Sequence, residues 1–324
     1  MKKILAVIPF AFASTAFAQS QATVDAHVAE ATRLAGSDLG ALMVLCKPAP
    51  ASRPPQAAVD AGIAKNIARP APAPGKAFDN LYFIGAAWVS AWAIKTSEGI
   101  ILIDALNNAK EAQELIDGGL RRLGMDPATI KYVIVTHAHG DHYGGAQYLV
   151  SKYKPRIVMS EPDWVQTETK LEFDSPSNWG PVPKRDLSVK DGDTVTLGGQ
   201  SVTINITPGH TLGTITPTFD VFSNGKKHRV LLWGGTAFNF GNNIPRMDTY
   251  IAATQRMAKI AQEQGIDVML SNHAGYDGTM AKLEALKKDP KSDAFVIGTP
   301  AVVRGLQVMG ECAQAQRDRY LLMK

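Results

Sequence analysis

The sequence predicts an α+β fold in which two β-sheets pack face to face and helices cover the outside of both. The first observation is that short apolar segments of strand length alternate with longer segments of helical periodicity in both halves of the chain. The second is that predicted strands in each half are followed closely by histidines, namely His137, His210 and His273. Because the loops at one edge of such a sandwich can bring these side chains together, we expect one functional site there.

The N-terminal part of the chain is expected to contain a helix followed by an extended arm. Residues 22–46 space their apolar side chains as a helix does and include a glycine that would stop it. Residues 47–76 are rich in proline and alanine, which favours an arm lying on or beside a domain, with a helical turn or two around residues 57–67. We therefore assign residues 19–77 to an N-terminal helix and arm, and residues 78–324 to one domain.

This domain is expected to begin with three strands and then to alternate between helices and strands. Strands are short apolar runs, whereas helices repeat apolar residues every three or four positions. The predicted strands cover residues 81–84, 90–94, 99–104, 132–135, 156–159, 187–197, 201–206, 230–233 and 268–270. The predicted helices cover residues 108–123, 146–152 and 247–264.

The composition excludes several classes of function. Apolar residues make up 45% of the chain and charged residues 20%, which is an ordinary balance for a globular protein. The net charge is only +4, and no dense stripe of lysine and arginine accompanies it. We therefore expect a small-molecule substrate and neither a nucleic acid nor a membrane surface as a partner.

The first residues are typical of a secretory signal peptide. Two lysines precede an apolar run that reaches Phe17, and Ala16 and Ala18 are small residues where a signal peptidase reads the chain. The apolar run is short for a membrane-spanning helix. We expect residues 1–18 to be removed by cleavage after Ala18, and the mature protein to be periplasmic and free of a membrane anchor.

The two cysteines, Cys46 and Cys312, lie near opposite ends of the mature chain and far in sequence from the histidines. An oxidising periplasm would permit a disulfide between them. It would close a very long loop and contribute ~4–5 kcal/mol in the chain-entropy model. Two buried free thiols are the alternative, since a sequence does not show whether the two Cα atoms come within bonding distance.

One short segment carries most of the functional information. Directly after the predicted strand 132–135, the chain places His137, His139, Asp141 and His142 within six positions. Neutral imidazole nitrogens and carboxylate oxygens are ligands that zinc accepts from proteins. The alternative is a polar loop whose histidines only cap and solvate it. The metal-site interpretation is favoured because the chain has only seven histidines and most of them follow predicted strands.

Two later histidines complete a recognisable order of motifs. His210 lies in Gly209-His210-Thr211 after one strand, and His273 follows another. With the first cluster, this order resembles the metallo-β-lactamase superfamily, over a stretch from Phe78 to just beyond His273. The resemblance implies that the two predicted sheets and their helices form an αββα sandwich.

The resemblance also implies roles for individual residues. One zinc ion would be held by three side chains and a second by three others, each ion keeping an open position for solvent. The first set is His137, His139 and His210, and the second is Asp141, His142 and His273. Asp104, which ends a predicted strand, would orient a ligand imidazole. Hydroxide formed between the zinc ions would attack a polarised carbonyl, and Asp141 would orient it.

Two differences from the motifs of other superfamily members indicate which subclass the sequence resembles. Many relatives, such as glyoxalase II, carry a bridging aspartate where this chain has Trp233-Gly234-Gly235-Thr236. Another β-lactamase subclass has a cysteine ligand in this part of the chain. Because this sequence has neither the bridging aspartate nor the cysteine ligand, it is similar to subclass B3 metallo-β-lactamases. Residues 78–85 also resemble the start of a B3 domain.

The function implied by this resemblance is opening of the β-lactam ring. An exported hydrolase of lactones, esters, thioesters or phosphoesters is the alternative, and a metal-binding protein without activity is a third possibility.

The substrate contacts are less clear from the sequence. Thr236 and Asn239 follow a strand end and could donate hydrogen bonds to a substrate, and Trp88 is a candidate wall of its pocket. Trp92, Trp164 and Trp179 are further candidates, although tryptophans are more often core residues. The motifs assign no cation to anchor a substrate carboxylate; Arg246 and Lys184 are the two cations considered for this role.

Overall fold

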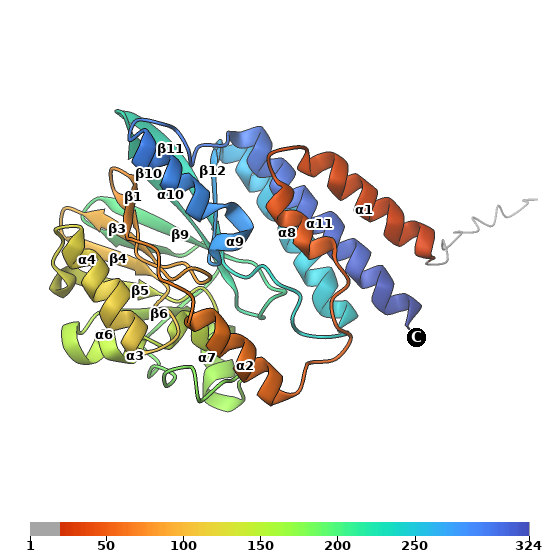
Figure 1. Cartoon of the computed structure of the whole chain (residues 1–324), viewed down its shortest axis with the longest axis horizontal. Helices are drawn as coiled ribbons and strands as arrows, with labels where there is room; N and C mark the ends of the chain where they lie inside the picture. Colours follow the sequence, from red (N-terminus) through yellow and green to blue (C-terminus); the bar gives the residue numbers. More distant parts are fainter. Residues whose placement is uncertain (1–19, 324) are drawn as a thin grey trace, which may run out of the picture.

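Two β-sheets flanked by helices form the centre of the molecule, as predicted (Figure 1). The computed structural model describes residues 20–323, so the predicted signal peptide and its cleavage site lie outside the described residues. In spatial order, the first sheet contains β1 (Gly75–Phe78), β2 (Leu81–Phe83), β3 (Trp92–Thr96), β4 (Gly99–Ile103), β5 (Ile130–Ile134), β6 (Arg156–Ser160) and β7 (Leu187–Val189). The second contains β12 (Val268–Ser271), β11 (Lys226–Trp233), β10 (Ile215–Ser223), β9 (Gln200–Ile206) and β8 (Thr194–Leu197).

The helices divide into an N-terminal group, a group between strands and a C-terminal group. The first consists of α1 (Gln21–Ala35), the 3-10 helix η1 (Gly40–Cys46) and α2 (Gln56–Ile67). The second consists of α3 (Ala109–Glu111), the π-helical segment η2 (Ala112–Asp117), α4 (Gly118–Arg122), the 3-10 turn η3 (Pro127–Thr129), α5 (Gly140–Tyr143), α6 (Ala146–Tyr153) and α7 (Glu161–Thr169). The last consists of α8 (Ile244–Gln264), α9 (Ala274–Asp277), α10 (Thr279–Lys288) and α11 (Thr299–Leu322).

Alternating side chains along the strands build two separate cores. In β4, Ile101 and Ile103 point between the sheets, where they join Ile204 and Phe219 of the second sheet. Leu102 points the other way, into the core under the helices that cover the first sheet. This is the two-residue period of a strand buried on both faces. Each fully buried side chain of this size contributes about 1.5–3 kcal/mol.

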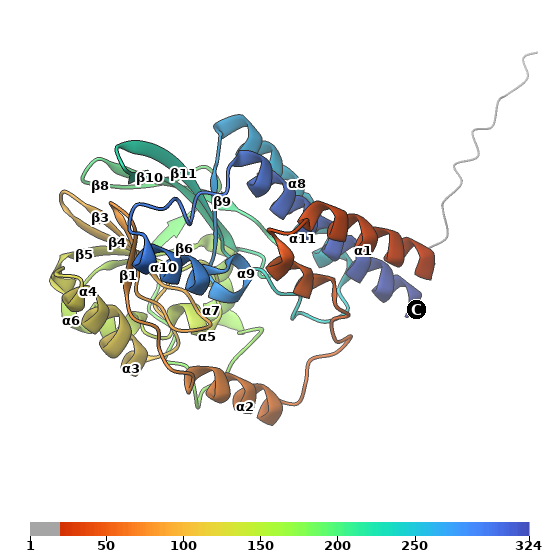
Figure 2. The same cartoon turned by 45° about the horizontal axis from the view of Figure 1, so that its top comes forward.

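Two long helices, α8 and α11, cover the outer face of the second sheet, and α1 packs against α11. Figures 1 and 2 show α1 side by side with α11, which in turn lies beside α8. Ala31 and Ala35 of α1 are buried in the same apolar cluster as Leu306 of α11 and Trp233 of β11. The predicted N-terminal helix is therefore present and packs on α11; it ends before Gly36, which caps α1 with a φ of 55°. No helix in the described part of the chain is both long and apolar enough to cross a membrane.

The proline-rich segment, here called the α2 arm (residues 47–74), runs from the long helices to the first sheet (Figure 2). A disulfide between Cys46 and Cys312 fixes its beginning to α11, so the predicted pairing is confirmed. The expected helical turns are present as α2. The first strand begins at Gly75, slightly before the expected start of the domain at Phe78.

Other boundaries differ from the predictions. The single strand expected over residues 187–197 is wrong, because a turn at Gly192, whose φ is 86°, divides this stretch. The part before the turn is β7 and belongs to the first sheet, whereas the part after it is β8 and belongs to the second. The strand β10 and the helices α7, α9, α10 and α11 were not among the predicted elements.

Candidate metal centre

Asp104 organises the loop that carries the first histidines. Its buried carboxylate follows β4 and accepts hydrogen bonds from the backbone N–H and the hydroxyl of Thr136, at 2.7 and 2.9 Å. It also accepts the Nδ1–H of His142, at 2.7 Å. Asp104 has a φ of 63°, which is uncommon for a non-glycine residue and is held here by these contacts. Asp104 was predicted to orient a ligand imidazole, and its hydrogen bond to His142 is the contact through which it would do so.

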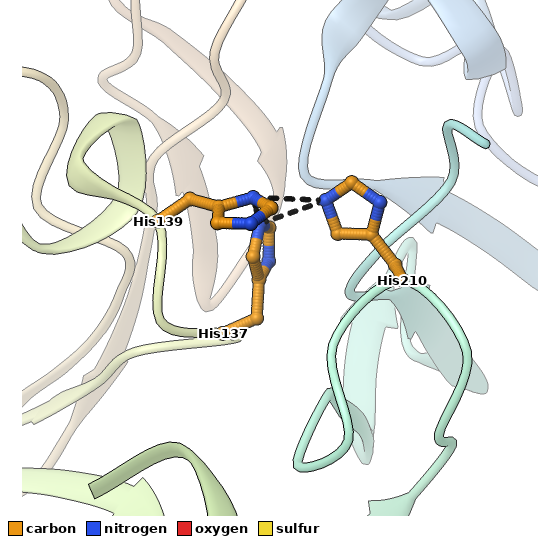
Figure 3. A group of neighbouring side chains, drawn as sticks. All are labelled: His137, His139 and His210. Atoms are coloured by element: carbon orange, nitrogen blue, oxygen red, sulfur yellow. Dashed lines mark hydrogen bonds between the residues drawn. The ribbon is translucent and has the colours of Figure 1, made fainter. Parts of the chain in front are cut away.

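Three of the predicted ligands bring their ring nitrogens together (Figure 3). His137 Nε2 lies 2.9 Å from His139 Nδ1, and His210 Nε2 lies 3.1 Å from both of these atoms. His137 and His139 follow β5 of the first sheet, whereas His210 lies in the loop after β9 of the second. Three nitrogens around a tetrahedral zinc ion would be separated by about 3.3 Å. The group therefore has the size of a three-histidine metal site.

The hydrogen bonds of the Nδ1 atoms of His137 and His210 indicate that a cation fits between these histidines. His137 Nδ1–H donates to the Gly234 carbonyl and His210 Nδ1–H donates to the Ala237 carbonyl, each at 2.7 Å. A neutral imidazole carries one N–H, so both Nε2 atoms present lone pairs. Two lone pairs 3.1 Å apart repel each other unless a proton or a metal ion lies between them. The donor set therefore suits a metal ion.

A second group lies next to the first. An oxygen of Asp141 is 3.5 Å from His142 Nε2 and 3.6 Å from His273 Nε2. Hydrogen bonds to Asp104 and to the Trp88 carbonyl occupy the Nδ1 atoms of His142 and His273, so their Nε2 atoms face the carboxylate. His142 Nε2 is buried and has no hydrogen-bond partner among the described residues. Asp141 thus lies beside both predicted partners, but the compact group of ligand atoms here consists of His137, Asp141 and His142 and does not include His273.

His137 lies between the two groups. Its ring centroid is 4.1 Å from that of His142, and its ligand atom also lies close to those of Asp141 and His142. The six predicted ligands therefore form one continuous cluster. Its members are at the ends of strands from both sheets, which is where the sequence predicted a site.

The protonation of the cluster suits metal ligation. Burial and the neighbouring imidazoles hold the pKa values of His137 and His139 well below the usual range. Burial likewise lowers the pKa of His210 to about 3 and that of His273 to about 4. For His142, burial lowers the pKa, but the carboxylates of Asp141 and Asp104 outweigh it and raise the pKa to about 10. These carboxylates favour a positive charge on or beside His142, and a metal ion would supply it.

The cluster lies in a groove of about 780 Å³, and some of the residues predicted to contact the substrate line this groove. Trp88, Asn239 and Trp179 line this groove. Thr236 does not: it is 1% exposed, its hydroxyl lies 3.2 Å from that of Ser271, and it borders a separate, smaller cavity. Two further candidate walls, Trp92 and Trp164, are fully buried in the two sheet cores.

Neither of the two cations considered as carboxylate anchors, Arg246 and Lys184, lines the groove. The guanidinium of Arg246 donates to the carbonyls of Gly209 and His210 and pairs with Glu172 at 2.7 Å. Arg246 therefore supports the loop that carries His210. Lys184 is exposed and does not line the groove.

Asp163 on α7 is a further residue of the site that was not among the predicted ones. Its buried carboxylate accepts the backbone N–H groups of Ala138 and Gly213, both at 2.9 Å, and the hydroxyl of Thr211 at 2.8 Å. Ala138 lies between two first-sheet ligands, and Thr211 follows His210. Asp163 therefore links the loops that carry the first ligand group. A lone aspartate in a polar helix gives no sequence signal of such a role.

Known proteins that resemble this chain indicate the class of protein to which it belongs. The family model described as "Metallo-beta-lactamase superfamily" matches residues 87–221. The hydroxyacylglutathione hydrolase of Rhodopseudomonas palustris strain BisA53 is 33% identical over 205 residues, which cover 63% of this chain and 69% of that protein. The enzyme of the same name from Idiomarina loihiensis is 26% identical over 223 residues, or 67% of this chain and 70% of that protein.

Solved structures show the same fold. BJP-1, a subclass B3 metallo-β-lactamase of Bradyrhizobium japonicum, has a TM-score of 0.67 and 26% identity, covering 78% of this chain and 97% of that one. Native FEZ-1 metallo-β-lactamase from Legionella gormanii has a TM-score of 0.63 and 22% identity, covering 78% and 95%. The sandwich and its buried histidine cluster are those of a metal-dependent hydrolase. The chain belongs to the metallo-β-lactamase superfamily.

Proposed function

We propose that the protein is an exported dinuclear zinc hydrolase that opens the β-lactam ring of antibiotics. The observation that carries this proposal is the pair of adjoining ligand groups without a bridging carboxylate. At the position where glyoxalase II has its aspartate, Gly235 lies against His210, and a Cβ there would come within 2.6 Å of the His210 Cβ. A side chain at residue 235 therefore has no room. The structural likeness to the B3 enzyme BJP-1 supports the same choice.

A second function has its own support. The relatives found by sequence are named hydroxyacylglutathione hydrolase, and the first of them is 33% identical. The alternative is therefore hydrolysis of a thioester, ester, lactone or phosphoester by the same site. The missing carboxylate at Gly235 is the feature that weighs against a glyoxalase II reaction.

In either reaction the protein groups have defined tasks. His137, His139 and His210 would hold one zinc ion, and Asp141, His142 and His273 the other. Zinc bound there supplies Lewis acidity, which polarises a carbonyl and lowers the pKa of water toward neutrality.

The remaining tasks belong to Asp141 and to the groove. The Asp141 carboxylate, one oxygen of which lies beside two imidazoles, is placed to orient the attacking water through its other oxygen. Asn239 and Trp88, which line the groove, would hold the substrate against the metal-binding edge.

We also propose that the reaction takes place in the periplasm. The disulfide between Cys46 and Cys312 supports an oxidising compartment. The signal-like first residues of the sequence support export.

A substrate panel tests the reaction. Purified, zinc-loaded protein is assayed with a cephalosporin, a carbapenem, an acyl lactone and a hydroxyacyl thioester of glutathione. We expect turnover of the β-lactams, and its loss to background when a chelator removes the metal. Turnover of the lactone or thioester without any β-lactam would contradict the β-lactamase proposal and support the alternative. No turnover of any substrate would leave a metal-binding protein.

A further inference from the structure

The α2 arm forms one wall of the metal groove. Arg53, Val59, Ile63, Asn66 and Arg69 line the groove together with the metal-ligand residues. Most of the other lining side chains are apolar. The arm is therefore part of the site, although it lies outside the region matched by the family model.

Hydrogen bonds hold the first part of the arm in place. Beside the disulfide, the Tyr320 hydroxyl donates to the Pro50 carbonyl at 3.1 Å. The backbone N–H of Asn242 donates to the Ala51 carbonyl at 3.0 Å. These contacts attach the arm to α11 and to the loop before α8, on one side of the groove.

The helix of the arm is attached on the other side. The Gln56 side chain donates to the Asp174 carbonyl at 2.7 Å, and Asp60 accepts the hydroxyl of Ser175 at 2.6 Å. The Asn178 side chain donates to the Asp60 carbonyl at 3.1 Å. Ile63, 7% exposed, is the buried side chain of α2. The arm is thus fixed at both ends of the groove, and it presents its remaining side chains in a defined place.

Two of these side chains are cations without a carboxylate partner. Arg53 and Arg69 are exposed, and neither forms an ion pair within the described residues. Among the described residues, Arg53, Arg69 and Asp141 are the guanidinium and carboxylate side chains that line the groove. The Arg53 guanidinium lies 4.6 Å from the centre of the Phe173 ring, and that ring lies 5.5 Å from the ring of His139. One aromatic ring thus separates Arg53 from a metal-ligand imidazole.

We propose that Arg53 and Arg69 bind the carboxylate of the substrate, and that the enzyme acts on anionic acyl compounds with an apolar body. This inference rests on the proposed hydrolase function and names its substrate class. A carboxylate held by a guanidinium at the arm and a carbonyl held at the metal edge would fix both ends of a substrate. The apolar walls between them would contact its uncharged part.

Paired thiol probes test the charge preference directly. An ω-mercaptoalkanoate and its carboxamide both offer a sulfur that zinc accepts, and they differ only in the negative charge. Their affinities for the zinc-loaded full chain are measured by calorimetry. The variants are R53Q, R69Q and the double variant; K65Q is the matched control, because Lys65 is an exposed cation of α2 that does not line the groove.

We expect the double variant to weaken binding of the carboxylate probe by about three- to tenfold, which is the combined effect expected for the loss of two exposed ion pairs. Binding of the carboxamide and binding to K65Q should change by less than about twofold. Added salt should weaken carboxylate binding to the unmodified protein more than to the double variant, since salt screens exposed charges. A double variant with lysine at positions 53 and 69 should bind the carboxylate probe more tightly than the carboxamide, nearly as the unmodified protein does.

Equal weakening of both probes in the double variant, an equal effect of K65Q, or no effect at all would overturn the inference. So would a failure of the carboxylate probe to bind the unmodified protein more tightly than its carboxamide. These results are separable from the fate of the proposed function. An enzyme that opens β-lactams without this charge preference contradicts the role of the arm alone. An enzyme that shows the preference but cleaves only thioesters contradicts the β-lactamase proposal alone.

Discussion

At the scale of single residues, Asp163 allows a test of what fixes the two loops that carry the proposed ligands His137, His139 and His210. Its carboxylate accepts the backbone N–H groups of Ala138 and Gly213 and the hydroxyl of Thr211, which belong to the two loops that carry the first proposed ligand group. In Asp163→Asn, one acceptor oxygen becomes an NH2 group that faces a donor. A buried donor without a partner costs about 1–3 kcal/mol. We expect a loss of unfolding free energy in that range, measured by urea denaturation, together with weaker zinc binding.

Glu161→Gln is the matched control for this substitution. Glu161 lies in the same helix, but its carboxylate is on the surface and pairs with Arg185 at 2.8 Å. Because exposed ion pairs contribute less than about 1 kcal/mol, this variant should keep its zinc affinity. An Asp163→Asn protein with unchanged stability and unchanged zinc affinity would show that the loops are fixed by other contacts.

The same residues show what could be predicted from the sequence and what could not. Four of the six proposed ligands are close together in the sequence, so their chemistry was visible as one motif. Asp163 and Arg53 each depend on contacts with residues far along the chain. An isolated aspartate or arginine has the same appearance in a sequence whether it is solvated or faces a site. Thr236 shows the opposite error, since a polar residue after a strand can point away from the groove.

At the scale of elements, the disulfide between η1 and α11 should be a major source of stability. It joins residues 266 positions apart, and the loss of a native disulfide typically costs about 2–5 kcal/mol. We expect the Cys46→Ser, Cys312→Ser double variant to lose stability in this range, measured by guanidinium denaturation. Reductant should lower the stability of the unmodified protein toward that of the variant and leave the variant unchanged. A variant as stable as the oxidised protein would contradict this expectation.

The missed elements have physical reasons as well. The strand β10 contains Pro217, which lacks the N–H that a strand interior normally uses, yet β10 is the central strand of its sheet. The helix α11 is packed between α1 and α8, so its buried residues include Gln316 and Asp318 and no single apolar stripe marks it. Strands such as β4 were predicted because burial on both faces leaves a continuous apolar run.

At the scale of the whole molecule, the proposed metal centre lies where the two sheets meet. His137 and His139 follow the first sheet and His210 comes from the second, so the first ligand group spans both. The second group does the same, since His273 follows β12 of the second sheet. Without a cation, the lone pairs of His137 and His210 repel each other across this junction. A metal ion bound to both histidines would therefore replace this repulsion with one bond to each sheet.

Zinc should accordingly stabilise the entire fold. A ligand that binds only the folded state at about 1,000 times its Kd adds about 4 kcal/mol. We expect the melting temperature, followed by calorimetry, to rise when zinc is added to chelator-treated protein and to fall again with chelator. His210→Ala should weaken the first ion, His142→Ala should weaken the second, and each should reduce the zinc-dependent shift.

His228→Ala is the control for these variants, because His228 pairs with Asp267 at 2.6 Å and is not one of the six ligands. This variant should keep the full response to zinc even where its own stability falls. Equal melting temperatures of the unmodified protein with and without zinc would contradict the bridging of the sheets by metal. A metal content of two ions per chain in both His210→Ala and His142→Ala would contradict the ligand assignment, since each substitution leaves one ion with only two protein ligands.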